Sequence, residues 1–137
     1  MQIHERKMEF GDDGAGLRER LIQQILAGVK TATCDLKEFC SAQEIRDLDG
    51  PFGWHETVLD GAGRARCNIR VTEVYETTFG NPDPRLVRGE GNGDDAAEFQ
   101  RGHEHFFAPL LKAKGLPALA EDSLLVVWEF ELAETPE

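Results

Sequence analysis

The chain has 137 residues with 26 acidic and 15 basic side chains, which gives a formal net charge of −11. Non-specific nucleic-acid binding draws its affinity from cations that displace phosphate counterions, so this charge argues against non-specific DNA binding. The length and the 40% hydrophobic content fit one globular domain, which we expect to span residues 1–137. Because the sequence has neither an apolar run long enough for a membrane span nor a signal-peptide pattern, we expect a cytoplasmic protein with no membrane partner.

The three cysteines are Cys34, Cys40 and Cys67, an odd number without the C-x-x-C spacing of a redox or zinc motif. This pattern indicates reduced thiols rather than a disulfide framework. Cys34 is a candidate nucleophile because it directly follows Thr33. A lone cysteine in a strand is more often a small buried hydrophobe, which is the favoured interpretation.

An amphipathic helix is predicted in the N-terminal part of the chain. Its apolar residues recur at helical spacing: Leu17, Leu21, Ile22, Ile25 and Leu26. Asp12 and Asp13 are placed to cap its first amides, and Gly28 is the expected stop. Lys30 and Thr33 then follow in a segment predicted to be extended. In a regular strand these two side chains would lie on opposite faces, so one site could use both only if the backbone bends there.

The segment over 38–49 has weak periodicity and room for a helical turn or two, and the breakers over 49–53 predict a loop. Period-two patterning then predicts a strand over 54–59, a turn over 60–63 and a long returning strand over 64–77. Arg64, Arg66 and Arg70 share one face of this second strand. They form either a short positive stripe or a solvated face balanced by neighbouring acids. Glu73 falls in register with apolar residues, so it either pairs with a lysine across the sheet or marks a bulge.

A loop over 81–84 and a short helical turn over 85–89 lead to a glycine-rich stretch over 89–93 that presents Glu90. Asp94 or Asp95 is expected to cap a second amphipathic helix that ends at Gly115. His103 lies on the apolar stripe of this helix, whose other members are Phe99, Phe106, Phe107, Leu110 and Leu111. Because His103 and His105 are two residues apart on a helix, they do not converge on one metal ion. A last strand is predicted over 123–132, buried at its start and half exposed at its end.

Seven of these segments, taken in order, resemble an ASCH-domain protein of the longer bacterial type. They are Phe10-Gly11-Asp12, Gly28-Val29-Lys30-Thr31-Ala32-Thr33, Val58-Leu59-Asp60-Gly61, Val71-Thr72-Glu73-Val74, Gly89-Glu90-Gly91, His103-Glu104-His105-Phe106-Phe107 and Val126-Val127-Trp128-Glu129-Phe130. The resemblance runs from about Phe10 to Leu132. It implies an α+β, PUA-like fold, in which a small mixed β-barrel is flanked by amphipathic helices.

The same resemblance implies a function connected with RNA or modified nucleosides. A short-type relative hydrolyses the acyl amide of N4-acetylcytidine with a lysine and a threonine of its G-x-K-x-x-T motif and a later glutamate. Lys30, Thr33 and Glu90 match these groups and are the candidate catalytic residues. The proposed chemistry uses a Thr–Lys pair with a lowered lysine pKa, and a Glu90 whose raised pKa would let it protonate the leaving amine.

The candidate substrate-binding residues are Trp54, Arg66, Arg70, Glu73 and His103, with Trp54 as a possible stacking face and His103 otherwise a packed helix residue. We expect an amidohydrolase for a modified pyrimidine nucleoside such as N4-acylcytidine, without a cofactor or metal. Two alternatives remain. One is a module that binds structured RNA through Lys30, Arg64, Arg66 and Arg70, and the other is a ribonuclease with a divalent cation held by acids such as Glu73 and Glu90.

Overall fold

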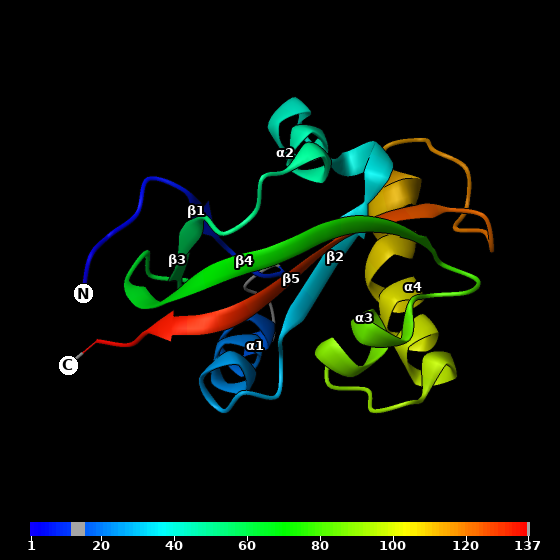
Figure 1. Cartoon of the computed structure of the whole chain (residues 1–137). Helices are drawn as coiled ribbons and strands as arrows, with labels where there is room; N and C mark the ends of the chain where they lie inside the picture. Colours follow the sequence, from blue (N-terminus) through cyan, green and yellow to red (C-terminus); the bar gives the residue numbers. More distant parts are fainter. Residues whose placement is uncertain (12–15, 137) are drawn as a thin grey trace.

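The computed structural model describes residues 1–11 and 16–136, which form a mixed α+β structure around one five-stranded sheet (Figure 1). The strand order is β1-β3-β4-β5-β2; β1 runs parallel to β3, and the other neighbours are antiparallel. The strands are β1 (Lys7–Met8), β2 (Ala32–Leu36), β3 (His55–Leu59), β4 (Ala65–Thr78) and β5 (Leu124–Glu134). The predicted strands in the middle and at the end of the chain are confirmed, whereas β1 lies in a segment without a clear pattern.

Helices cover both faces of the sheet. The described helices are α1 (Leu17–Leu26), η2 (Lys37–Phe39), α2 (Ala42–Arg46), η3 (Asp47–Asp49), α3 (Pro84–Gly89) and α4 (Ala96–Ala113). In Figure 1, α2 lies on one side of β4 and β5, while α1 and α3 lie on the other. None of the helices in the described ranges is long and apolar enough to cross a membrane.

The helix boundaries follow from local chemistry. Gly28 takes φ 77° just after α1, which is the turn that a helix stop requires, and the Asp95 carboxylate accepts a hydrogen bond from Glu98 N at the start of α4. Ser41 and Glu44 form a capping box for α2, so the weak pattern over 38–49 does contain a helical turn. The caps expected of Asp12 and Asp13 lie outside the described residues; the N-cap of α1 is Gly16.

The predicted closure of the sheet into a barrel is not observed. β1 and β2 are the two edges of the described sheet, and no ladder joins them. The register of β4 against β5 shifts between Val71 and Glu73, which confirms the bulge interpretation of this segment. The side chain of Glu73 binds Arg85 at 3.1 Å rather than a lysine across the sheet.

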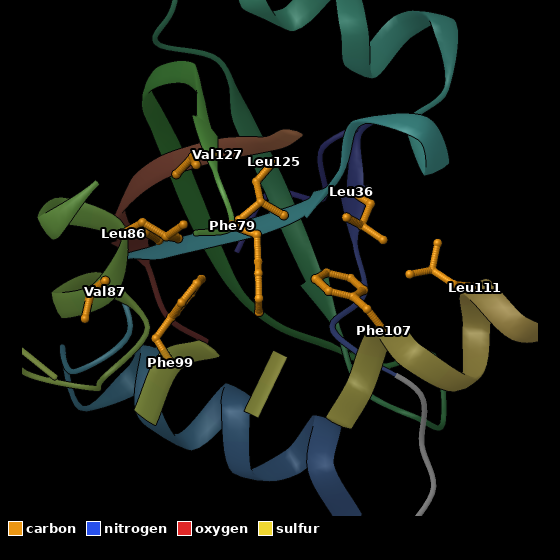
Figure 2. Packing of buried hydrophobic residues seen from close by; sticks show 10 residues of the cluster. Leu36, Phe79, Leu86, Val87, Phe99, Phe107, Leu111, Leu125 and Val127 are labelled. Carbon is orange, nitrogen blue, oxygen red and sulfur yellow. The ribbon is translucent and has the colours of Figure 1, made fainter. Parts of the chain in front are cut away.

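The main hydrophobic cluster lies between the sheet and the α3–α4 layer (Figure 2). Phe99, Phe107 and Leu111 point from α4 toward the strands, and Leu125 and Val127 of β5 meet them. The alternate residues of β5, Val126 and Trp128, pack in another cluster with Ile45 and Leu48 from the other side of the sheet. The first half of β5 is therefore buried on both faces, as its apolar run predicts. This packing fixes α3 and α4 against β2, where the candidate site lies.

Candidate active site at the β2 edge

A tight backbone contact brings Lys30 and Glu90 together. Lys30 N donates to Gln24 O at 3.1 Å, and Thr31 N donates to Gly89 O at 2.8 Å, so the turn after α1 and the end of α3 are joined. A Cβ at Gly89 would lie 2.5 Å from Ala32 Cβ. Only glycine allows this approach, which places the next residue, Glu90, beside Lys30.

Lys30, Glu90 and His103 form a continuous hydrogen-bonded row. Lys30 is 3% exposed; its Nζ donates to Ala32 O at 2.7 Å and to Glu90 Oε1. The other carboxylate oxygen, Oε2, lies 2.6 Å from His103 Nε2, and His103 Nδ1 lies 2.9 Å from Phe99 O. A carbonyl oxygen only accepts, so Nδ1 must carry a hydrogen and a further proton must lie between Nε2 and Oε2. The Glu90 carboxylate is therefore bound by a proton-bearing nitrogen on each side.

Glu90 is ionised in this arrangement. Burial acts to raise its pKa, but the charge of Lys30 and the hydrogen bonds from His103 and Lys30 outweigh burial and hold the pKa at about 2. The raised pKa expected for a proton-donating Glu90 is therefore wrong. A carboxylate with this pKa positions and stabilises its two proton-bearing neighbours instead.

Cys34 also contacts this row, with its Sγ 3.8 Å from Glu90 Oε2. Burial, and then the negative charge of Glu90, raise the pKa of the Cys34 thiol well above its usual value. Because only the thiolate is a strong nucleophile, the structure favours the interpretation of Cys34 as a neutral packed thiol.

A cavity of about 340 Å³ opens onto these residues; we call it the Glu90 cavity. Lys30, Thr33, Cys34, Glu90 and His103 line it together with aromatic side chains. Lys30 lies in the turn after α1, before β2 begins, so the alternation of a regular strand does not separate its side chain from that of Thr33. Within the described chain the Thr33 hydroxyl makes no hydrogen bond, which leaves it free to contact a ligand.

A second cavity of about 590 Å³ lies between the sheet edges; we call it the Asp35 cavity. Lys7 and Met8 of β1 border it on one side, and Thr33, Cys34 and Asp35 of β2 border it on the other. Thr33 and Cys34 of β2 each line both cavities, so the two cavities adjoin along this strand. In a closed barrel β1 and β2 would pair with each other, whereas here the Asp35 cavity lies between them.

Four predicted substrate-binding residues line neither cavity. Arg66 pairs with Glu19, Arg70 pairs with Glu131, and Glu73 pairs with Arg85. The arginine face of β4 is thus balanced by acids. Trp54 donates from Nε1 to Glu56 Oε2 at 2.7 Å and lies under the guanidinium of Arg6, at 4.8 Å, so one face of its ring is already covered.

The remaining predicted residues do converge. Lys30, Thr33, Glu90 and His103 all border the Glu90 cavity. The role of His103 as the partner of Glu90 was missed by sequence reasoning, because neither residue's spacing reveals a contact between a loop and a helix. Gln24, which lines the same cavity, was also missed; its buried Oε1 has no hydrogen-bond partner in the described part of the chain.

The donor atoms of Cys34, Glu90 and His103 lie within 4.8 Å of one another, a set that could hold a metal ion. Thiolate, carboxylate and imidazole are ligands that zinc accepts. Here Glu90 already binds Lys30 and His103, and a metal would require the loss of the Cys34 proton. Glu73, the other expected acid of the ribonuclease interpretation, is bound to Arg85 outside both cavities.

Comparison with known proteins agrees with this architecture. No curated protein matches the chain. Protein EF3133 from Enterococcus faecalis V583 is similar in structure, with a TM-score of 0.78 and 24% identity over 98% of this chain and 80% of that one. An ASCH domain from Lactobacillus crispatus JV V101 has a TM-score of 0.77 and 25% identity, covering 94% of this chain and 79% of that one.

A third solved structure, hypothetical protein PH0355, has a TM-score of 0.54 and 16% identity, covering 85% of this chain and 94% of that one. The family model of the ASCH domain matches residues 6–134, which include both cavities and every strand. The chain belongs to the ASCH domain family.

Proposed function

We propose that this protein is a small amidohydrolase that removes the acyl group from a modified pyrimidine nucleoside such as N4-acylcytidine. The observation that carries this proposal is the convergence of Lys30, Thr33 and Glu90 on one cavity. Their side chains supply a hydroxyl nucleophile and a network that can accept and return a proton, which is what amide hydrolysis needs.

In the proposed reaction Thr33 Oγ1 attacks the acyl carbon, and the hydroxyl proton passes to Lys30 Nζ as Lys30 gives one of its own protons to the amide nitrogen. The C–N bond then breaks, the nucleoside leaves with this proton on its exocyclic nitrogen, and the acyl group remains on Thr33 as an ester. Water hydrolyses this ester, which releases the carboxylic acid and restores the threonine hydroxyl. Glu90 remains ionised throughout, so the protons are carried by the nitrogen atoms of Lys30 and His103.

The size and lining of the Glu90 cavity support a planar heterocyclic substrate. Its volume of about 340 Å³ lies at the lower end of the range for small-molecule sites, roughly 300–1,000 Å³. Phe10, Phe99, Phe106 and Phe107 surround the polar groups of this cavity. Phe10, Phe99 and Phe107 are packed in the core, so Phe106, which is only partly buried, is the ring on which a pyrimidine can stack while its exocyclic amide meets the polar row.

A turnover assay of the purified protein against N4-acylated cytidines tests the proposal. We expect cytidine release, reduced by about 10²–10⁴-fold in Lys30→Ala and lost in Thr33→Val, which keeps the shape of the side chain but removes the hydroxyl. Lys37→Ala is the matched control, because Lys37 forms an exposed ion pair with Glu76 outside the Glu90 cavity. Full activity of Lys30→Ala would contradict the proposed role of this residue.

RNA recognition without chemistry is less well supported. It needs cations that are free to bind phosphates, whereas Arg66 and Arg70 each pair with an acid and Lys30 pairs with Glu90. A steep fall of RNA affinity with added salt would favour it over the hydrolase proposal.

A further inference from the structure

The Asp35 cavity adjoins the Glu90 cavity through shared wall residues. Phe10, Thr33, Cys34 and Phe106 border both of them. A group bound at the Thr33 hydroxyl can therefore extend from one cavity into the other. At about 590 Å³ the Asp35 cavity is the larger of the two, so it can hold a substantial part of a ligand whose reacting end lies beside Glu90.

The charge of the Asp35 cavity is negative. Four acids border it, Glu9, Asp35, Glu44 and Glu56, against two bases. The first base, Arg6, binds Asp47 through two hydrogen bonds of 3.0 and 2.8 Å and also lies 3.5 Å from Glu56. The second, Lys7, donates from Nζ to the backbone carbonyls of His4 and Glu5. Arg6 is therefore held by carboxylates, whereas Lys7 forms no ion pair among the described residues, and the lining carries two more acids than bases.

Asp35 is the acid best placed to contact a ligand at Thr33. The two residues lie two positions apart on β2, so their side chains share a face of the strand. Asp35 Oδ1 accepts from Leu36 N at 2.9 Å, and no cation pairs with this carboxylate among the described residues. Burial raises the pKa of Asp35 to about 6, so the group is desolvated at the cavity wall and still ionised at neutral pH.

We propose that the Asp35 cavity binds the sugar of the substrate and, through its excess of carboxylates, excludes phosphate, so that the protein acts on free nucleosides and not on nucleotides or RNA. This inference rests on the proposed hydrolase function and adds a substrate class to it. Sugar hydroxyls can donate hydrogen bonds to a carboxylate such as that of Asp35. In dinucleotide-binding sites, an aspartate or glutamate accepts hydrogen bonds from the ribose hydroxyl in this way. A 5′-phosphate or an RNA backbone would instead bring negative charge toward a lining in which four acids outnumber two bases.

The test compares kcat/KM for N4-acetylcytosine, N4-acetylcytidine and N4-acetylcytidine 5′-monophosphate at 0.15 M salt. We expect the nucleoside to be the best substrate, because the free base lacks the sugar contacts. The monophosphate should be slower than the nucleoside by at least about tenfold, the effect of roughly 1.4 kcal/mol of charge repulsion.

Variants assign this selectivity to the cavity. Asp35→Asn should raise the ratio of monophosphate to nucleoside turnover by about threefold, and adding Glu44→Gln should raise it further, since each change removes one repelling charge. Glu76→Gln is the matched control. It removes one charge from an exposed ion pair on β4, outside both cavities, and should leave the ratio unchanged.

A binding measurement separates failure of this inference from failure of the hydrolase proposal. Calorimetric titration with cytidine and with cytidine 5′-monophosphate does not depend on turnover. Equal turnover of nucleoside and monophosphate, or equal binding of the two titrants, would overturn phosphate exclusion. Absence of turnover with preferential binding of cytidine would remove the hydrolase function and keep the nucleoside class. Tight, salt-sensitive binding of a short RNA would overturn the inference.

Discussion

Glu90 is an acid whose ionisation the fold maintains. Its pKa of about 2 lies below the ordinary value of 4.5, because Lys30 and His103 outweigh the effect of burial. A carboxylate with a lowered pKa contributes stability that is complete above pH 4.5 and is lost as the pH falls toward 2. We therefore expect Glu90 to contribute about 2 kcal/mol less to the free energy of unfolding at pH 3 than at pH 6.

Urea unfolding of the wild type and of Lys30→Met/Glu90→Gln at the two pH values measures this contribution. The double variant removes both buried charges, so no uncompensated ion from this pair remains. Its free energy of unfolding should fall less on acidification than that of the wild type. An equal decrease in the free energy of unfolding of both proteins on acidification would show that Glu90 is not the group responsible for the pH dependence of stability.

Asp35 has the opposite pH dependence. Its pKa is raised to about 6 by burial, so the stability present below its ordinary value of 3.8 is lost as the pH rises through 6. Asp35→Asn should remove this cost and stabilise the protein by about 1 kcal/mol at pH 7.5, a value reduced for partial solvent exposure, and by less at pH 4.5. Thermal unfolding at the two pH values checks this, and a variant that is less stable at pH 7.5 would contradict it. A residue that lowers stability at neutral pH is typical of a functional site.

At the scale of elements, the contact between α3 and β2 decides whether the site forms. Gly89→Ala places a Cβ 2.5 Å from Ala32 Cβ, so one element must move. We expect a loss of about 1–3 kcal/mol in the free energy of unfolding, together with a loss of activity, because Glu90 moves with α3. Chemical denaturation and the turnover assay measure the two effects.

Gly80→Ala is the matched control for this substitution. A Cβ there would lie 2.5 Å from Glu121 Cβ, an equally short contact that lies outside both cavities. This variant should lose stability and retain kcat. If both variants kept full kcat, the α3–β2 contact would not be what positions Glu90.

Much of the element structure could be predicted because it depends on local pattern. The stripe before Gly28, the alternation over 64–77 and the cap at Asp95 each express a period or a hydrogen bond within a few residues. β1 could not be predicted in this way. Its two residues pair with β3 in a parallel ladder, and the residues over 1–10 show no alternation that would signal it.

The site was predictable in part. The G-x-K-x-x-T resemblance led to Lys30 and Thr33, and glycines on both sides of Glu90 marked a carboxylate held close to other backbone. The contact of Glu90 with His103 arises from the packing of α4 against α3, which is a tertiary result. The arginines of β4 were chosen from strand parity alone, and parity does not show that Glu19 and Glu131 lie within reach.

At the scale of the whole molecule, excess negative charge opposes compaction. The chain has 26 acids against 15 bases. Exposed ion pairs such as Arg101–Glu98 contribute about 0–1 kcal/mol each and weaken with salt, whereas mutual repulsion of the excess acids is relieved by salt. We expect the second effect to dominate, so that raising NaCl from about 0.05 to 0.5 M increases Tm by about 2–5 °C.

Differential scanning calorimetry in NaCl measures this shift. Chloride is preferred to sulfate, because sulfate strengthens apolar burial by itself and would raise Tm for a different reason. A lower Tm at high salt would mean that the ion pairs outweigh the net charge.

The open edges of the sheet have a consequence for the behaviour of the protein in concentrated solution. An exposed strand edge can recruit a strand of another molecule and start aggregation. Here β1 has two residues and β2 has five, and both edges face the recess that holds Asp35. Both edges are short and border a cavity lined with acidic side chains, so we expect them to be poor templates for pairing with a strand of another molecule.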